Sequence, residues 1–159
     1  MTRIRVSTLV AAPRADVWRA VADIGAHVRW MRDAEAIRFT SPRRTGVGTT
    51  FECDTKVGPL RLNDRMEVTE WREGRVMGIR HTGAVSGSGR FTLKRRRAGT
   101  LFTWEERLRF PWWLGGQLGG AVAGPVLRRL WRQNLVNLKA VVEAGREPAP
   151  IKGRRRRRG

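Results

Sequence analysis

The sequence predicts an α+β fold in which one antiparallel sheet of seven strands packs against helices, and three observations lead to this prediction. Apolar and polar residues alternate with the period of a strand near the N-terminus and again from residue 36 to residue 110. Short turn-like separators divide that second region into six strands joined as a meander. Apolar residues then recur at helical spacing from Leu127 to Val142, which predicts a long amphipathic C-terminal helix.

The N-terminal elements are predicted to be a strand and two short helices. Alternation over residues 4–10 indicates the first strand. Pro13 suits the first turn of a helix and Gly25 suits its end, with apolar residues at helical spacing between them. A second short helix is expected over residues 27–32. His27, in its first turn, is interpreted as a surface or capping residue.

The meander consists of six predicted strands with turn residues between them. Their ranges are 36–40, 48–57, 60–71, 75–82, 86–95 and 100–110. Cys53, the only cysteine, alternates with charged neighbours and is interpreted as a small buried residue on a strand. A single cysteine also excludes an intramolecular disulfide and a cysteine-based zinc site.

Several short motifs resemble one known superfamily when taken in order. They are Ala12-Pro13 followed by Asp16-Val17-Trp18 and Trp30, then Gly46-Val47-Gly48-Thr49-Thr50-Phe51, Gly99-Thr100 ahead of Thr103-Trp104-Glu105, and Leu138-Lys139 with Glu143. In this order and spacing the chain resembles the START-like, helix-grip superfamily (SRPBCC), in its polyketide cyclase/dehydrase-like branch. The resemblance implies a helix-grip fold over residues 1–145, in which a curved sheet wraps around the C-terminal helix and leaves a cavity between them.

Residues 110–127 form an uncharged run of eighteen residues, long enough to be considered as a membrane span. The run contains five glycines and two prolines, which are poor residues for an isolated helix. As a helix it would cover only ~27 Å, a bare fit to the hydrocarbon core. We therefore expect it to line or roof the cavity; the alternatives are peripheral contact with a membrane surface and, least favoured, a true span. The helix starts either at Pro125 or between Leu114 and Gln117, and the resemblance favours the earlier start.

Strand parity predicts which side chains face the cavity. Asp64, His81 and Glu106 each share a strand face with apolar residues, and ionisable groups facing a core are often functional, so these three are the candidate acid/base residues. The alternative is that the carboxylates pair with arginines and only orient a ligand. The predicted ligand-binding residues are Trp30, Phe51, Leu62, Met66, Ile79, Phe91, Trp104, Leu108, Trp112, Trp113, Leu114, Leu127, Trp131 and Asn134.

No motif for a cofactor or a metal ion is recognised. The sequence GSG at 87–89 lies in a predicted strand hairpin without a following helix, so it does not match a phosphate-binding loop. We expect no cofactor and no metal. The N-terminus lacks the features of a signal peptide, so a cytoplasmic location is expected.

The chain is strongly basic, with a formal charge of +19, and six of the positive charges lie in the last eight residues. Residues 146–159 are expected to form a disordered tail. Arg154, Arg155, Arg156, Arg157 and Arg158 predict weak contact with polyanions or anionic membranes. No aromatic residues interleave with these arginines, so specific nucleic-acid recognition is not expected.

The first functional hypothesis is therefore binding of a small hydrophobic ligand: a lipid, a polyketide or an aromatic metabolite. The second is a cyclase or dehydratase that uses Asp64, His81 or Glu106. The third is a membrane-surface or nucleic-acid-associated module that acts through its basic tail. The absence of tyrosine and the single plausible pocket histidine favour binding over catalysis. The sequence does not determine the oligomeric state.

Overall fold

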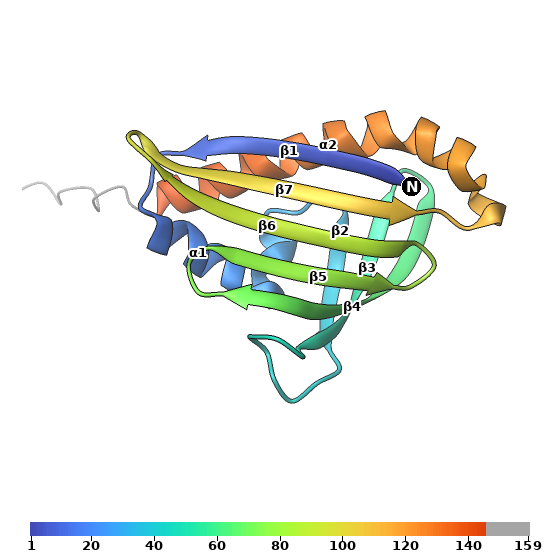
Figure 1. The fold of residues 1–159 in the computed structure, drawn as a ribbon, viewed down its shortest axis with the longest axis horizontal. Helices are drawn as coiled ribbons and strands as arrows, with labels where there is room; N and C mark the ends of the chain where they lie inside the picture. The colour runs from blue at the N-terminus through green and yellow to red at the C-terminus, as the bar shows by residue number, and fades with distance from the viewer. Residues whose placement is uncertain (146–159) are drawn as a thin grey trace, which may run out of the picture.

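The computed structural model describes residues 1–145, which form a seven-stranded antiparallel sheet with helices on one side (Figure 1). The N-terminal elements are β1 (Thr2–Val10), α1 (Arg14–Ala22), the 3-10 helix η1 (Ile24–Arg29) and β2 (Ala34–Phe39). The meander continues with β3 (Thr50–Val57), β4 (Leu60–Arg72), β5 (Val76–Thr82), β6 (Ser86–Arg96) and β7 (Gly99–Arg109). A short 3-10 helix, η2 (Trp112–Leu114), leads into α2 (Gly116–Ala144).

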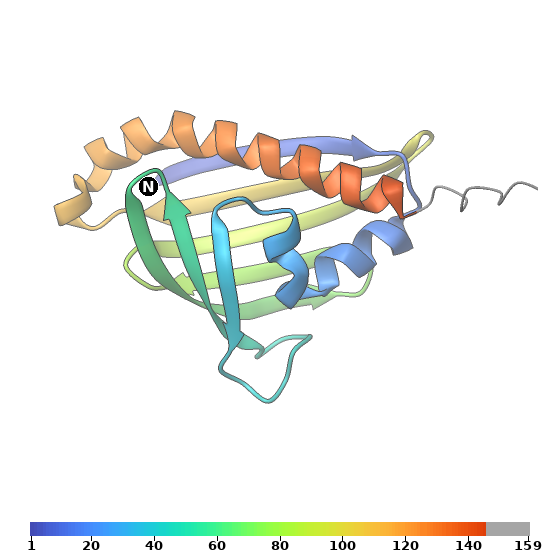
Figure 2. The ribbon, with the colours of Figure 1, turned by 180° about the vertical axis from the view of Figure 1, so that it is seen from behind.

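The strand order in the sheet is β1-β7-β6-β5-β4-β3-β2. Strands β2 to β7 pair with their sequence neighbours, and β1 joins the far edge next to β7. Seen from behind, α1, η1 and α2 all lie on the same face of the curved sheet, and α2 runs along β1 and β7 (Figure 2). This confirms the predicted helix-grip arrangement.

The predicted strands are all present, with ends that differ by one or two residues. The short helix expected over residues 27–32 is wrong in place and type. The side chain of Asp23 accepts a hydrogen bond from the amide of Ala26, and this cap starts a 3-10 helix at Ile24, three residues earlier. The preceding helix accordingly ends at Ala22.

The C-terminal helix begins at Gly116, as the resemblance favoured, and Pro125 lies inside it. A proline there cannot donate to the carbonyl of Ala121, but both residues are exposed, so water can reach that carbonyl. Within residues 1–145, no helix is long and apolar enough to span a bilayer.

The core lies between α2 and the concave face of the sheet. Leu135 and Leu138 are fully buried, and the ring of Trp131 stacks on that of Trp104 with 4.8 Å between centroids. The predicted packing of Leu127, Trp131, Leu135 and Leu138 on a face that carries Phe51, Leu62, Phe91 and Trp104 is confirmed. The predicted tail, residues 146–159, lies outside the described residues.

Candidate ligand-binding cavity

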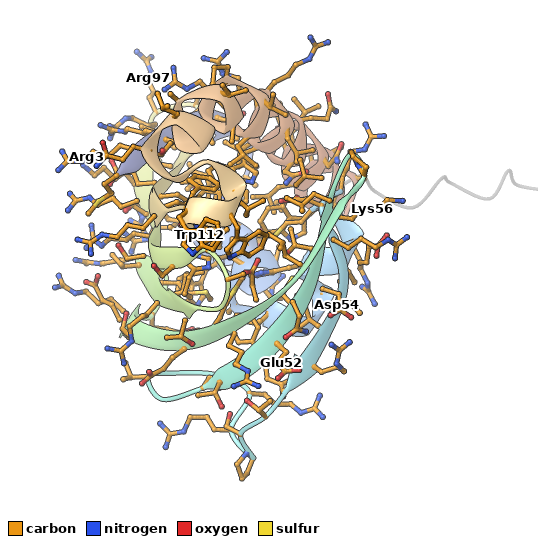
Figure 3. The ribbon with its side chains drawn as sticks, turned by 90° about the vertical axis from the view of Figure 1, so that its right-hand side faces the viewer. Arg3, Glu52, Asp54, Lys56, Arg97 and Trp112 are labelled. Atoms are coloured by element: carbon orange, nitrogen blue, oxygen red, sulfur yellow. The ribbon has the colours of Figure 1, made fainter. Side chains whose placement is uncertain are left out.

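A cavity of about 640 Å³ lies between the concave face of the sheet and the first half of α2. This volume falls within the range of small-molecule sites, about 300–1,000 Å³. Most of the lining is apolar. The polar side chains that reach it are His27, Asp33, Thr55, Asp64, His81 and Glu106. Figure 3 looks onto the end of the molecule where β7 leads into α2, with Trp112 in front and Lys56 at the tip of the β3–β4 hairpin.

Most of the predicted ligand-binding residues lie in the cavity wall. These are Phe51, Leu62, Met66, Ile79, Phe91, Trp104, Leu108, Leu114, Leu127 and Trp131. The three candidate acid/base residues also line it. Alternation along β4 predicted correctly that the side chain of Asp64 faces the cavity. The irregularity in the pairing of β4 with β5 lies between Val68 and Glu70, after Asp64, so it does not change the face on which Asp64 lies.

The other four predicted ligand-binding residues lie away from the cavity lining. Trp112 and Trp113 project into solvent instead of roofing the cavity, because the turn η2 aims them outward and only Leu114 points in. Trp30 is packed in the core against Phe91 and Trp104.

Asn134 is also buried outside the cavity lining, where it connects α2 to the segment between η1 and β2. Its amide nitrogen donates to Oδ1 of Asp33 across 2.6 Å, and its oxygen accepts from the backbone amide of Arg32. Trp131 donates through Nε1 to the other oxygen of Asp33. The Asp33 carboxylate is thus satisfied by two neutral donors, and this network holds α2 over the cavity.

Glu106 is at the centre of a buried polar cluster. Its Oε2 accepts a hydrogen bond from Nε2 of His81 across 3.1 Å, and its Oε1 accepts one from the indole of Trp104 across 2.8 Å. Burial lowers the pKa of His81, but the hydrogen bond and charge of Glu106, together with the charge of Asp64, outweigh burial and raise it above its usual value. The pair therefore stabilises the protonated form of the His81 imidazole.

A glycine on the strand between the two residues allows this contact. His81 is on β5 and Glu106 on β7, so strand β6 lies between them. The β6 residues that pair with them in the ladder are Gly87, opposite His81, and Gly89, opposite Glu106. A Cβ on Gly89 would collide with the Glu106 carboxylate. The GSG segment, which matched no phosphate loop, is thus the signal in the sequence that could have predicted this pair.

Asp64 lies on β4 in the same cavity wall, and one of its oxygens is left without a partner. Thr55 donates to Oδ2 across 3.2 Å, whereas Oδ1 is buried and makes no hydrogen bond to the described residues. Burial raises the pKa of this carboxyl, and the charge of His81 and the hydrogen bond from Thr55 oppose that only in part. A protonated Asp64 could donate a hydrogen bond to a ligand oxygen.

Within residues 1–145 no ion pair joins Asp33, Asp64 or Glu106 to an arginine, contrary to the pairing that the alternative interpretation expected. Arg61, Arg80 and Arg90 form ion pairs instead with Glu35, Glu67 and Glu70. Those pairs lie on the outer face of the sheet: the three arginines and Glu67 alternate with the inward-facing positions of their strands, and the irregularity in β4 after Val68 turns Glu70 to the same face.

Sequence reasoning placed His27 on the surface, but it is buried and lines the cavity. Its Nε2 donates to the carbonyl of Val21 across 2.7 Å. Burial lowers the pKa of His27 to about 4, so the ring is neutral near pH 7. No periodicity marked this residue, because its burial depends on η1 packing on the sheet.

Cys53 and Thr55, also missed as cavity residues, follow Phe51 on the inward face of β3. Parity along that strand could have found them. Among residues 1–145 there is no cluster of His, Cys, Asp and Glu suited to a metal ion.

A curved antiparallel sheet closed by a long C-terminal helix, with an apolar cavity between them, defines a helix-grip protein of the START-like class. The family model described as "Polyketide cyclase / dehydrase and lipid transport" matches residues 1–143. The chain belongs to this family. No curated protein sequence matches it significantly.

Solved structures agree in fold. TTHA0849 from Thermus thermophilus superposes with a TM-score of 0.75 at 16% identity, over 91% of this chain and 99% of that one. The Zhui aromatase/cyclase from Streptomyces sp. R1128 superposes with a TM-score of 0.64 at 20% identity, over 96% of this chain and 98% of that one. DynU16, a putative protein in the dynemicin biosynthetic locus, superposes with a TM-score of 0.66 at 20% identity, over 91% of this chain and 48% of that one. Family and fold together support a ligand-binding or cyclase role.

Proposed function

We propose that this protein binds one small hydrophobic molecule, a lipid, a polyketide or an aromatic metabolite, in the cavity between the sheet and α2. The observation that carries the proposal is the apolar cavity of about 640 Å³ with Asp64, His81 and Glu106 close together on its sheet wall. Apolar walls supply affinity, and a few convergent polar groups fix the orientation of the ligand.

The polar wall indicates which end of a ligand it would receive. Asp64 offers an unpaired oxygen, and the His81–Glu106 pair carries a polarised proton. These groups suit a ligand with an oxygen function, such as a carbonyl or hydroxyl, at one end and hydrocarbon at the other. A ligand hydroxyl could donate to Oδ1 of Asp64, which has no hydrogen bond to the described residues, and a ligand carbonyl could accept from a protonated Asp64.

The test is titration with the neutral apolar fluorophore N-phenyl-1-naphthylamine. One probe is expected to bind per chain. Met66→Trp fills the cavity wall and should weaken binding at least about tenfold, because a larger side chain removes volume from the site. Arg65→Trp places the same ring on the outer face of the same strand and is the matched control. Equal probe affinity in both variants would contradict the proposal.

A second candidate function is catalysis of a cyclisation or dehydration. The observation that favours it is the gathering of Asp64, His81 and Glu106 in an apolar site, where proton transfer next to a carbonyl is feasible. Asp64→Asn and Glu106→Gln are nearly isosteric changes. With a true substrate they should reduce turnover by ~100-fold or more while probe affinity changes little. Parallel, modest effects on binding and turnover would indicate that these groups only orient the ligand.

A further inference from the structure

The mouth of the cavity is surrounded by apolar side chains that face water. Leu118, Val122 and Val126 lie on successive turns of α2 at the cavity opening and are 81%, 75% and 54% exposed. In the turn before the helix, Trp112 is 87% and Trp113 52% exposed. We call these five residues the mouth patch. A cluster of this kind on a single surface indicates an interaction site.

The mouth patch is not explained by packing. From Arg128 onward α2 exposes charged and polar residues, Arg128, Arg129, Arg132 and Gln133, and the only large apolar side chains exposed there are Val136 and Val141, which are separated from each other. On the first half the inward positions are already apolar, and the outward positions are apolar as well. Large apolar side chains that contact neither core nor partner cost solubility, so the patch points to a surface that becomes covered.

Arginines lie next to the patch. Arg129 continues the exposed stripe of Val122 and Val126 one turn further along α2. Arg3 on β1 and Arg128, Arg129 and Arg132 on α2 line a groove between these two elements, which we call the arginine groove. Gly120 lets the helix approach, because a Cβ there would collide with Thr2.

The arginines of the groove lack acidic partners among the described residues. None of the ion pairs within residues 1–145 includes Arg3, Arg128, Arg129 or Arg132. Arg3 is moreover opposite Arg107 in the β1–β7 ladder, a like-charge pair that costs stability. The groove is therefore complementary to an external anion.

We propose that the mouth patch and the arginine groove together form a docking surface for an anionic lipid bilayer. Tryptophan rings reside favourably at the level of the headgroups, aliphatic side chains enter the acyl region, and arginines contact lipid phosphates. The patch borders the cavity opening, so docking would let an apolar ligand move between bilayer and cavity without crossing water. The movement of a ligand between bilayer and cavity rests on the proposed function of ligand binding, whereas docking to the bilayer does not.

The experiment is co-sedimentation of the full chain with vesicles in the absence of ligand. Binding to vesicles that contain phosphatidylglycerol is expected to be at least about tenfold tighter than binding to pure phosphatidylcholine, and to weaken with salt. The double variant L118D/V122D should lose at least about tenfold in affinity for the anionic vesicles. Val136→Asp is the matched control, since Val136 is 55% exposed on the same helix but lies five turns from Leu118, and it should bind as the parent does.

The charge contribution is tested separately. R128E/R129E should weaken binding to anionic vesicles at least about tenfold. R96E/R97E, the same change in the β6–β7 hairpin at the opposite end of the sheet, should have a much smaller effect (Figure 1). Both variants keep residues 146–159, so binding through that segment is common to all samples.

Three results would overturn the proposal. The first is that L118D/V122D binds anionic vesicles as tightly as the parent does. The second is that R128E/R129E and R96E/R97E lose the same amount of affinity for those vesicles. The third is a dimer, or an acidic protein partner, that L118D/V122D disrupts while vesicles bind nothing. Probe titration of the same samples separates the two proposals: vesicle binding without probe binding leaves docking intact and refutes ligand binding, and the converse refutes docking alone.

Discussion

The imidazole of His81 donates a hydrogen bond to the carboxylate of Glu106 across 3.1 Å although a complete strand, β6, lies between their strands. Neighbouring strands are about 4.8 Å apart, so the two backbones are about 10 Å from each other. The side chains can meet because Gly89, opposite Glu106 on β6, has no Cβ, which would collide with the carboxylate. The strongest polar feature of the cavity therefore depends on a residue that has no side chain.

Gly89→Ala tests this dependence. The backbone of Gly89 has no positive φ, so alanine is sterically allowed there and the only new element is a methyl group against Glu106. We expect a loss of about 1–3 kcal/mol in the free energy of unfolding, measured by urea denaturation. In the double variant G89A/E106A the collision is gone, and the combined loss should be smaller than the sum of the single losses. Strict additivity would show that the methyl group does not meet the carboxylate.

The His81–Glu106 pair predicts a loss of stability at alkaline pH. Because the pKa of His81 is raised in the folded protein, its contribution is complete below about 6.5, the unfolded value, and is lost as pH rises through the folded pKa. The urea concentration at the midpoint of unfolding should therefore fall as the pH rises from about 6.5 through the folded pKa of His81 in the parent protein, and should not fall in Glu106→Gln. In the variant, NMR should show a lower pKa of His81 than in the parent protein, since burial remains and the hydrogen bond and charge of Glu106 are gone. An unchanged titration would contradict the pairing.

His27 predicts the opposite slope on the acid side. Its pKa is lowered to about 4 by burial, so the unfolded chain takes up a proton below pH 6.5 while the folded protein does not. Stability should fall by about 3 kcal/mol between pH 6.5 and pH 4 from this residue. His27→Gln keeps a donor for the carbonyl of Val21 and should remove that part of the slope. The chain has only two histidines, so both can be followed in one NMR titration.

Cys53 can report on occupancy of the cavity. Burial raises the pKa of its thiol to about 11, against an ordinary value of 9.0, so at pH 8 the thiolate fraction is about 100-fold lower than in the unfolded chain. Labelling by a maleimide should be slowed at least in that proportion. Because Cys53 lines the cavity, saturating N-phenyl-1-naphthylamine should slow it further. If the labelling rate of Cys53 does not change when the probe is added, the probe binds at a site other than this cavity.

Asn134→Ala is expected to be strongly destabilising. The change leaves one oxygen of the buried Asp33 carboxylate and the amide of Arg32 without partners, at a cost of about 2–4 kcal/mol in the free energy of unfolding. Gln133→Ala, on the exposed side of the same helix, is the control and should cost less than about 0.5 kcal/mol. Similar losses in the two variants would mean that the network around Asp33 does not hold α2 to the sheet.

The strands and their inward faces could be predicted from the sequence, because alternation depends only on the geometry of an extended backbone. Parity assigned Asp64, His81 and Glu106 to the cavity wall, and helical spacing assigned Trp131, Leu135 and Leu138 to the face that packs on the sheet. These assignments needed no knowledge of which strands are neighbours. The resemblance supplied the rest of the architecture.

The direction of side chains outside regular elements could not be predicted. In the segment that enters α2, composition suggested that Trp112 and Trp113 cover the cavity, whereas the single turn of η2 directs both into solvent. His27 was assigned to the surface and is buried for a similar reason, since the cap at Asp23 shifts the start of η1. A shift of one or two residues in a short helix turns a side chain from one face to another.

By itself, therefore, the sequence determined the order of the elements, the inward face of each strand, and three of the ionisable groups in the cavity wall, Asp64, His81 and Glu106. Only the tertiary structure decided which of these groups meet. Within residues 1–145 Glu106 contacts His81 across β6 and no arginine, and Oδ1 of Asp64 has no hydrogen-bond partner. Asn134 donates to Asp33 and does not line the cavity. The physical reason is that periodicity is a property of one strand or helix, whereas hydrogen bonds and burial depend on distances between elements that are far apart in the chain.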